Sequence, residues 1–374
     1  MTITASQLKT EILSGLTISV ALVPEAISFA LLVGAAPQVG LWAAVFMALS
    51  TALFGGRPGL ISGATGATAV ILAALVKSHG MDHLFLGVIV AGIIQFIIWG
   101  TNLWKVFDKI PKAAMSGFLI SLAVMIFISQ LAHLRVGNPD TTKLAIILCT
   151  VTVSAMAMWY SIKHFKFPPA LSAILAGTAI GIPFGLPTVG DLSPVTAALP
   201  SLSTPTINLD MLLAVLPYSL GVAISGLTES LIAVGTLGSK KRETLAQSIG
   251  NVVSGMFNSM GGCVLIGQSN LNINAGAKHR LSAIVAALGL VSIILAFGQF
   301  IEHIPLAGLI GVMMVVVIQT GDWRSLITLD VNRMIIIFGT TSLAFATNNL
   351  AIGVIFGTIL HYTVKRYSTW QKQQ

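Results

Sequence analysis

Residues 53–69 read LFGGRPGLISGATGATA, and residues 256–275 read MFNSMGGCVLIGQSNLNINA. Each stretch runs from an aromatic residue through glycines and a short β-branched or Leu stretch into a polar helix start. The segment near 268–278 is too short and too polar to cross a bilayer, since a complete apolar helix takes roughly 20 residues. Paired, glycine-interrupted short segments are typical of membrane transporters built from inverted repeats. These two stretches therefore predict a membrane-protein fold built from two inverted repeats, each with one short, interrupted segment.

The composition of the chain indicates a polytopic α-helical membrane protein. The chain has 374 residues, of which 55% are hydrophobic and only 9% are charged. A soluble domain would carry about 25% charged residues. The first apolar run lacks a cleavable small-residue site, so we interpret it as a retained span. We predict fourteen membrane segments at about 12–33, 38–54, 62–76, 84–100, 112–132, 143–160, 168–183, 211–237, 244–260, 268–278, 281–299, 305–319, 331–347 and 349–364.

The distribution of positive charge predicts the orientation. If the N-terminus is cytoplasmic and the segments alternate, seventeen of the 20 Lys and Arg residues fall on the inner side. The outer side receives only Lys77, Arg135 and Lys143. This bias predicts an even number of spans in the plasma membrane, with both termini cytoplasmic. The net charge of +8 lies in short clusters between apolar runs, which argues against a nucleic-acid partner.

The two halves of the chain correspond to one another. Glu25 and Glu229 are 204 residues apart, and each lies inside an apolar run. Seven segments separate the two copies, so they would insert with opposite orientations. We predict a single transmembrane domain over residues 1–374, with inverted repeats at about 8–183 and 207–365.

Glu25 and Glu229 are the acids that the pattern places deep inside membrane segments. A buried ionisable group in lipid costs at least a few kcal/mol, which indicates a functional or structural partner. The alternative is that each carboxylate caps local backbone or pairs with a hydroxyl. Pro24 lacks an N–H group, so it predicts a break in the first span beside Glu25.

The starts of the two short segments are candidate anion-binding elements. Small residues at 63–68 and 267–270 would let a ligand approach the backbone, where the first N–H groups of a helix are unpaired and partly positive. Two such starts facing one another would bind an anion without Lys or Arg. The alternative is close helix packing through small residues. Neutral hydrogen-bond donors would come from Thr65, Gln268, Ser269 and Asn270.

Two ionised glutamates beside an anion would repel it by several kcal/mol at low effective dielectric. Either one glutamate is protonated, or a bound cation such as Na⁺ near Glu229 neutralises the charge. Both options predict that anion movement is coupled to H⁺ or Na⁺, and the sequence does not choose between these ions. No HExxH, P-loop, GxSxG or paired CxxC motif occurs, so we expect no enzyme activity, cofactor or other metal.

These motifs resemble those of the SulP family of sulfate permeases and related anion transporters. The similar stretches are GLTISVALVPEAISFALLVGAAPQVGLWAAVF (15–46), FGGRPGLISGATGA (54–67), GLTESL (226–231) and GGCVLIGQSNLNINAGAKHRLS (261–282), and the resemblance covers residues 10–365. It implies a seven-plus-seven inverted-repeat fold with core and gate domains, and a site between the third and tenth segments. Carried over by motif, the site comprises Glu25, Phe29, Thr65, Gly66, Ala67, Glu229, Gln268, Ser269 and Asn270.

The chain departs from the family pattern in three ways, and two of them concern the substrate. Many members have Pro-Gln where this chain has Pro24-Glu25, and many have Arg at the position of Gln268. Both differences lower the positive potential, which favours a monovalent anion such as bicarbonate, or an anion carried with a cation, over sulfate. The family usually carries a cytoplasmic STAS domain, and we expect none within this chain, which ends at Gln374. The oligomeric state stays open between a monomer and a homodimer.

The sequence therefore predicts secondary active transport of a small inorganic anion of the sulfate or bicarbonate class, by alternating access across the lipid bilayer. Two alternatives stay open. A nucleobase-type permease of the same fold would use Glu229 to hydrogen-bond an uncharged amide ring, and an uncoupled anion channel would conduct without concentrating its substrate. A purely structural role would not require paired polar half-helices.

Overall fold

The computed structural model describes residues 4–137, 139–164, 168–195, 198–203, 208–327 and 330–371, with side chains to residue 366. Two of the cations predicted on the inner side, Lys166 and Lys372, lie outside these ranges. The elements are α1 (Ala5–Val33), α2 (Pro37–Phe54), β1 (Ser62–Gly63), α3 (Gly66–His79), α4 (Asp82–Gly100), η1 (Leu103–Lys109), α5 (Lys112–His133), α6 (Thr141–His164), α7 (Pro169–Gly181), α8 (Val189–Leu192), α9 (Leu209–Val234), α10 (Lys240–Met256), β2 (Cys263–Val264), α11 (Ile266–Asn274), α12 (Leu281–Glu302), α13 (Leu306–Thr320), η2 (Trp323–Ile327), α14 (Val331–Thr347) and α15 (Leu350–Gln371).

The predicted all-helical, multi-pass membrane fold is confirmed. Among the described residues, seven helices are long and apolar enough to cross a membrane, namely α1, α2, α4, α5, α6, α9 and α12. Each of the fourteen predicted segments coincides with one helix, although the number of complete spans stays a prediction. The half-helices α3 and α11 have 14 and 9 residues, too few to cross a bilayer.

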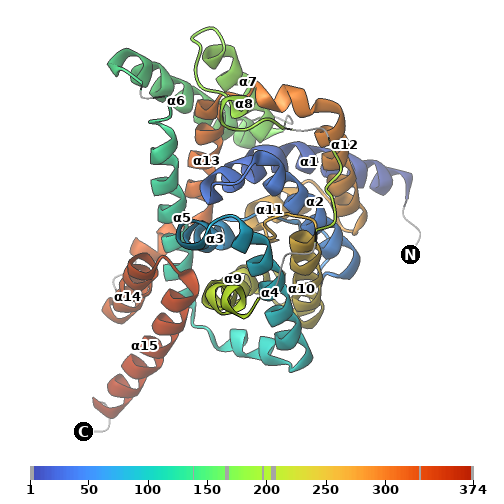
Figure 1. Cartoon of the computed structure of the whole chain (residues 1–374). Helices are drawn as coiled ribbons and strands as arrows, with labels where there is room; N and C mark the ends of the chain where they lie inside the picture. The colour runs from blue at the N-terminus through green and yellow to red at the C-terminus, as the bar shows by residue number, and fades with distance from the viewer. Residues whose placement is uncertain are drawn as a thin grey trace.

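The helices form two groups that meet along one face. One group contains α1 to α4 and α9 to α12, which pack mainly against one another. The other contains α5, α6, α7, α13, α14 and α15, which also pack mainly among themselves. Figure 1 shows α5, α14 and α15 on one side of the molecule and α2, α10 and α12 on the other. This division corresponds to the core and gate that the resemblance implied.

The two short strands join the starts of the half-helices. Strands β1 and β2 pair antiparallel, with Ser62 opposite Val264 and Gly63 opposite Cys263. The backbones approach so closely here that a Cβ atom on Gly262 would lie 1.8 Å from the Gly63 carbonyl oxygen. Only glycine can occupy position 262 without moving the backbone. The strands therefore fix α3 and α11 relative to one another.

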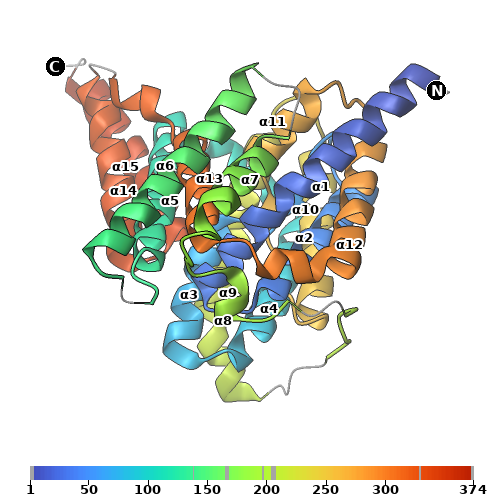
Figure 2. The same cartoon turned by 90° about the horizontal axis from the view of Figure 1, so that it is seen from above.

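The start of α1 and the end of α15 lie at the same edge of the molecule in Figure 2, and the start of α9 lies at the opposite edge. This arrangement agrees with an even number of crossings between the ends of the chain. That this edge faces the cytoplasm stays a prediction from the charge bias.

The predicted break at Pro24 is wrong, because α1 continues through this residue to Val33. A proline inside a helix removes one backbone hydrogen bond, and the tertiary packing of α1 against α2 and α12 holds the helix on both sides of it. The half-helices begin at Gly66 and Ile266, within a few residues of the predicted starts.

Candidate functional site

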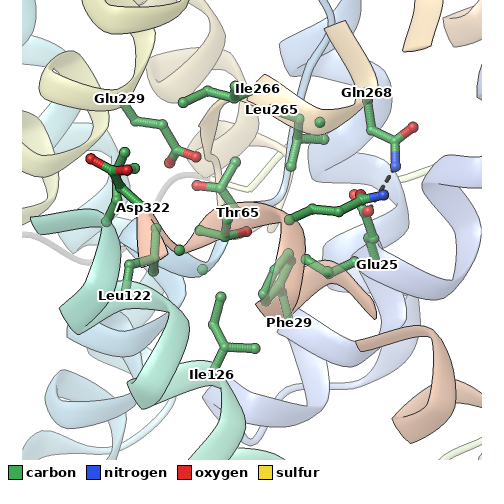
Figure 3. A pocket seen from close by; sticks show the side chains of 17 residues that line it. Glu25, Phe29, Thr65, Leu122, Ile126, Glu229, Leu265, Ile266, Gln268 and Asp322 are labelled. Carbon is green, nitrogen blue, oxygen red and sulfur yellow. Dashed lines mark hydrogen bonds between the residues drawn. The ribbon is translucent and has the colours of Figure 1, made fainter. Parts of the chain in front are cut away.

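A cavity of about 310 Å³ lies where α1, α3, α9 and α11 face α5 and α13 (Figure 3). Both helix groups contribute to its wall, so a ligand bound there would contact core and gate together. The first group supplies Glu25, Phe29, Thr65, Gly66, Glu229, Leu265, Ile266, Gly267 and Gln268. The second group supplies Leu119, Leu122, Ile126, Val316, Gln319, Thr320, Gly321 and Asp322.

The start of α3 presents free backbone amides to the cavity. Thr65 precedes the first residue of the helix in an extended conformation, and its side chain does not cap the helix. The first i to i−4 hydrogen bond of the helix runs from the Ala69 N–H to the Thr65 carbonyl oxygen at 2.9 Å. The N–H groups of Gly66, Ala67 and Thr68, which precede Ala69 in the first turn, therefore have no hydrogen-bond partner within α3. These groups carry partial positive charge.

The start of α11 has the same character. Leu265 precedes the helix and makes no side-chain cap, and the Ser269 N–H donates to the Leu265 carbonyl oxygen at 2.9 Å. Gly267 lies exposed in the cavity wall. A Cβ atom added there would meet only Gln319 Oε1, at 3.8 Å. A ligand therefore has room to approach this backbone closely.

Glu25 is 4% exposed and lies opposite Gln268. Its Oε1 accepts a hydrogen bond from Gln268 Nε2 at 2.7 Å. Within the part of the chain that the structure describes, Glu25 Oε2 and Gln268 Oε1 are buried without a hydrogen-bond partner. Unpaired buried acceptors are costly, so a proton or a cation at this position would stabilise the site.

Glu229 is 6% exposed and enters the cavity from α9. Its Oε2 accepts a hydrogen bond from Cys263 Sγ at 3.1 Å. Cys263 Sγ is in turn 2.9 Å from Thr65 Oγ1, on the other half-helix start. A short hydrogen-bonded chain thus connects the α9 carboxylate to the first turn of α3.

The cavity wall is acidic. It carries Glu25, Glu229 and Asp322, and none of its lining residues, all of which the structure describes, is Lys, Arg or His. Asp322 follows α13 and accepts a hydrogen bond from Ser116 Oγ on α5 at 2.6 Å. Positive potential for an anion therefore comes from backbone amides, while the carboxylates provide sites for a proton or a cation.

The structure brings together six of the nine predicted site residues: Glu25, Phe29, Thr65, Gly66, Glu229 and Gln268. The other three, Ala67, Ser269 and Asn270, do not line the cavity. Ala67 is buried in packing, and Asn270 is exposed away from the wall. Ser269 Oγ instead accepts from the Ile61 N–H at 2.9 Å and supports the strand crossing. Their roles as ligands stay predictions.

Sequence reasoning missed the wall that α5 and α13 contribute. Leu119, Leu122 and Ile126 belong to an apolar segment that reads like any other span. Asp322 reads as an ordinary loop acid next to Arg324. The resemblance implied a gate domain, which could have indicated that a second group of helices completes the cavity. No sequence motif identifies the residues of that domain here.

Comparisons with known proteins agree with this architecture. The model of the sulfate permease family matches residues 8–143 and 135–340. The putative sulfate transporter YbaR of Bacillus subtilis is 35% identical over 369 residues, which cover 94% of this chain and 76% of YbaR. The bicarbonate transporter BicA of Picosynechococcus is 28% identical, over 97% of this chain and 71% of BicA.

Two solved structures are similar. The transmembrane domain of a cyanobacterial bicarbonate transporter BicA superposes with a TM-score of 0.81 at 27% identity, covering 94% of this chain and 98% of that one. The murine Solute Carrier 26 family member A9 anion transporter, in its inward-facing state, gives a TM-score of 0.81 at 16% identity, covering 97% of this chain and 69% of that one, and shows the fold alone. With the family model matching most of its length, this chain belongs to the sulfate permease family.

Proposed function

We propose that this protein is a secondary active transporter that moves a small inorganic anion, coupled to H⁺ or Na⁺. One observation carries the proposal: two uncapped half-helix starts and two buried glutamates line the same cavity between the helix groups. Membership of the family and the names of the relatives, which are sulfate and bicarbonate transporters, support an anion as cargo and a transporter rather than an enzyme.

The substrate that fits best is a monovalent anion of the bicarbonate class. The two positions that depart from the common family residues, Glu25 and Gln268, contact one another at 2.7 Å. Where many members have a neutral Gln and a cationic Arg, this pair offers a carboxylate and a neutral amide. A divalent anion would find less compensating charge here, at a cost that grows with the charge of the ligand.

The acidic wall supports coupling to a cation. An anion at the half-helix starts would lie beside Glu25 and Glu229, and repulsion between like charges in a cavity of low effective dielectric costs several kcal/mol. A proton or Na⁺ on one carboxylate removes this cost. Binding of the anion and binding of the cation then favour one another, which is the requirement for symport.

The position of the cavity supports alternating access. Gly66 packs against α5 so closely that a Cβ atom there would lie 2.6 Å from Ile126 Cδ1. The exposed side of the wall lies at Gly267 and Gln319, near the C-terminal end of α13. With the predicted orientation, this is the cytoplasmic side. Movement of one helix group against the other would close this side and open the opposite one.

The test is uptake of labelled bicarbonate and labelled sulfate into proteoliposomes, with an imposed pH gradient, an imposed Na⁺ gradient, or neither. We expect saturable accumulation that follows one of the two gradients, with bicarbonate preferred. Absence of saturable uptake of either anion would overturn the proposal. Competition by uracil or xanthine would favour a nucleobase permease, and large unsaturating currents without accumulation would favour a channel.

A further inference from the structure

We propose that Cys263 is a positioning residue: when Glu229 gains a proton, Cys263 reverses a chain of hydrogen bonds and turns the Thr65 hydroxyl into a donor for the anion. The inference rests on the proposed function in its proton-coupled form. It assigns to the strand crossing the task of connecting the proton site to the anion site.

The chain consists of three side chains on three elements. Cys263 lies on β2, is fully buried, and has its Sγ 3.1 Å from Glu229 Oε2 and 2.9 Å from Thr65 Oγ1. Glu229 and Thr65 both line the cavity, whereas Cys263 does not. Because the Thr65 side chain does not cap α3, its hydroxyl is available to this chain. The Thr68 hydroxyl also lies near it, with its Oγ1 3.3 Å from Thr65 Oγ1, but Thr68 donates to the Thr65 carbonyl oxygen at 3.1 Å, and Cys263 Sγ is the nearer partner at 2.9 Å.

The direction of the hydrogen bonds depends on the charge of Glu229. An ionised carboxylate can only accept, so the Cys263 thiol donates its proton to Glu229 Oε2. The sulfur then accepts from the Thr65 hydroxyl, the remaining donor at 2.9 Å. In this state the Thr65 hydroxyl hydrogen points at sulfur, and the Thr65 side chain presents only oxygen lone pairs to the cavity. The Thr65 hydroxyl then repels an anion bound at the neighbouring amides.

Protonation of Glu229 reverses each step. One proton from solution forms an O–H bond on Glu229, and this new donor bonds to the sulfur. The thiol hydrogen rotates to Thr65 Oγ1, and the Thr65 hydroxyl hydrogen becomes free to point into the cavity. No other covalent bond forms or breaks. Anion binding to Thr65 therefore favours protonation of Glu229, and protonation favours anion binding to the same extent.

Other titratable groups face the same region and set the controls. Glu25 on α1 and Asp322 after α13 share the cavity with Glu229. Glu243 on α10 is buried nearby, but its carboxylate accepts from the Gly56 N–H at 2.8 Å and from Gln247 Nε2 at 2.7 Å. Within α11 no residue is titratable, and the charged residues of α3 and α4 lie in their terminal turns. The cations Lys365 and Arg366 lie in the C-terminal half of α15. A residual pH effect after removal of Cys263 is thus expected from Glu25.

A second observation, an unpaired acceptor in the cavity wall, points to a ligand or a counterion beside Thr65. Glu25 Oε2 is buried in the wall without a partner among the residues that the structure describes, although Glu25 is only 4% exposed. Figure 3 shows Thr65 between Glu229 and Glu25 in the wall of the cavity. A donor hydrogen released on Thr65 would therefore point into the space where the ligand and its counterion meet.

The first test is the pH dependence of the KM for bicarbonate in proteoliposomes, with bicarbonate itself rather than total inorganic carbon held constant. For the unmodified protein we expect the KM to fall by about tenfold on acidification, the size of one hydrogen bond to a charged group. Cys263→Ala and Thr65→Val should each flatten most of this dependence, and together they should do no more than either alone. Cys263→Ser and Thr65→Ser should restore it, because a hydroxyl also donates and accepts.

The second test observes the thiol directly by infrared spectroscopy of its S–H stretching band. The chain has two cysteines, so a Cys149→Ala background leaves Cys263 as the single thiol, and Cys149 is exposed on α6 and remote from the site. We expect the band to shift towards weaker hydrogen bonding on acidification, since the acceptor changes from a carboxylate to a neutral hydroxyl. In the Glu229→Gln variant, the band should not respond to pH.

The two tests separate failure of this inference from failure of the proposed function. Absence of transport in every condition would overturn the function, while the infrared band would still report whether the chain reverses. Normal transport with an unchanged pH profile in Cys263→Ala would overturn the inference alone. A variant that lowers the maximal rate equally at every pH would show that Cys263 has only a structural role, which also contradicts the inference.

Discussion

Four carboxylates are buried in the part of the chain that the structure describes, and they form two contrasting pairs. Glu11 and Glu243 are 1% and 0% exposed, and Glu25 and Glu229 are 4% and 6% exposed. Glu11 accepts from the backbone N–H groups of Lys278 at 2.6 Å, His279 at 2.9 Å and Ser282 at 3.0 Å. Glu243 accepts from one backbone amide and one side-chain amide, whereas Glu25 and Glu229 each accept from one side chain only.

The difference teaches that burial alone does not mark a functional acid in a membrane protein. Glu11 closes the start of α12 and satisfies amides that would otherwise have no acceptor. Its charge is fixed by the backbone, so loss of that charge would cost stability. Glu25 and Glu229 depend on side chains that can rotate, and each faces a cavity. We therefore expect that Glu25 and Glu229 can change charge without disturbing the fold.

The largest effect is expected for Glu229→Gln, which imitates a permanently protonated acid. We expect gradient-driven accumulation to be abolished while exchange of anion across the membrane continues, because the coupling proton can no longer leave. Uptake into proteoliposomes with and without a gradient is the measurement. The matched control is Glu243→Gln, which should keep gradient-driven accumulation. Normal gradient-driven accumulation by Glu229→Gln would contradict the assignment of a transport role to Glu229.

The next effect is on stability and concerns Glu11→Ala. This change leaves three amide groups at the start of α12 without their acceptor, and each unsatisfied buried group costs about 1–3 kcal/mol. We expect the protein in detergent to unfold at a clearly lower temperature, by several degrees. Glu25→Gln, which removes an incompletely paired charge, should unfold at an unchanged or higher temperature. Equal losses in the two variants would contradict the comparison.

A smaller and more specific effect is expected for Gln268→Arg. Arginine at this position would pair with Glu25 and restore positive potential beside α11. We expect the preference for sulfate over bicarbonate to rise by about tenfold, which corresponds to about 1.4 kcal/mol. Competition between the two labelled anions measures this ratio. Gln319→Arg, on the α13 wall of the same cavity, is the control and should shift it less.

The smallest effect is expected for Asp322→Asn at the cavity mouth. Asp322 is partly exposed, so water and salt screen its charge. Removal of this carboxylate should lower the KM for the anion by about twofold at low ionic strength, and by less at high ionic strength. An effect on transport as large as that of Glu229→Gln would show that Asp322 acts together with Glu25 and Glu229, and would contradict the expectation that its charge is screened.

Much of the site could be predicted because its chemistry is unusual for a membrane segment. Glycines before a short polar helix, and a glutamate inside an apolar run, stand out against their surroundings, and these signals found Thr65, Glu25 and Glu229. Polarity does not reveal which way a side chain faces. Ser269 and Asn270 follow Gln268 directly, yet successive helix residues point in different directions, and neither lines the cavity.

The rest of the site depends on tertiary structure that no local pattern encodes. Leu122 and Ile126 close over Gly66 only because α5 packs against the start of α3. Glu11 and Glu243 lie at segment ends, where an acid is ordinarily solvated. Their burial comes from the loops before α12 and before β1, which bring backbone amides to them. Glu11 and Lys278 are 267 residues apart in the sequence, and Glu243 and Gly56 are 187 residues apart. A local sequence pattern cannot predict contacts over such separations.

The crossing at Gly262 and Gly63 has a consequence for how this protein can change through evolution. A Cβ atom at position 262 would lie 1.8 Å from the carbonyl oxygen of Gly63, and every residue type at position 63 carries that backbone oxygen. Position 262 is therefore restricted to glycine whichever residue stands on the opposite arm. A chimera that exchanges one half of the chain for that of a relative should fold only if residue 262 stays glycine.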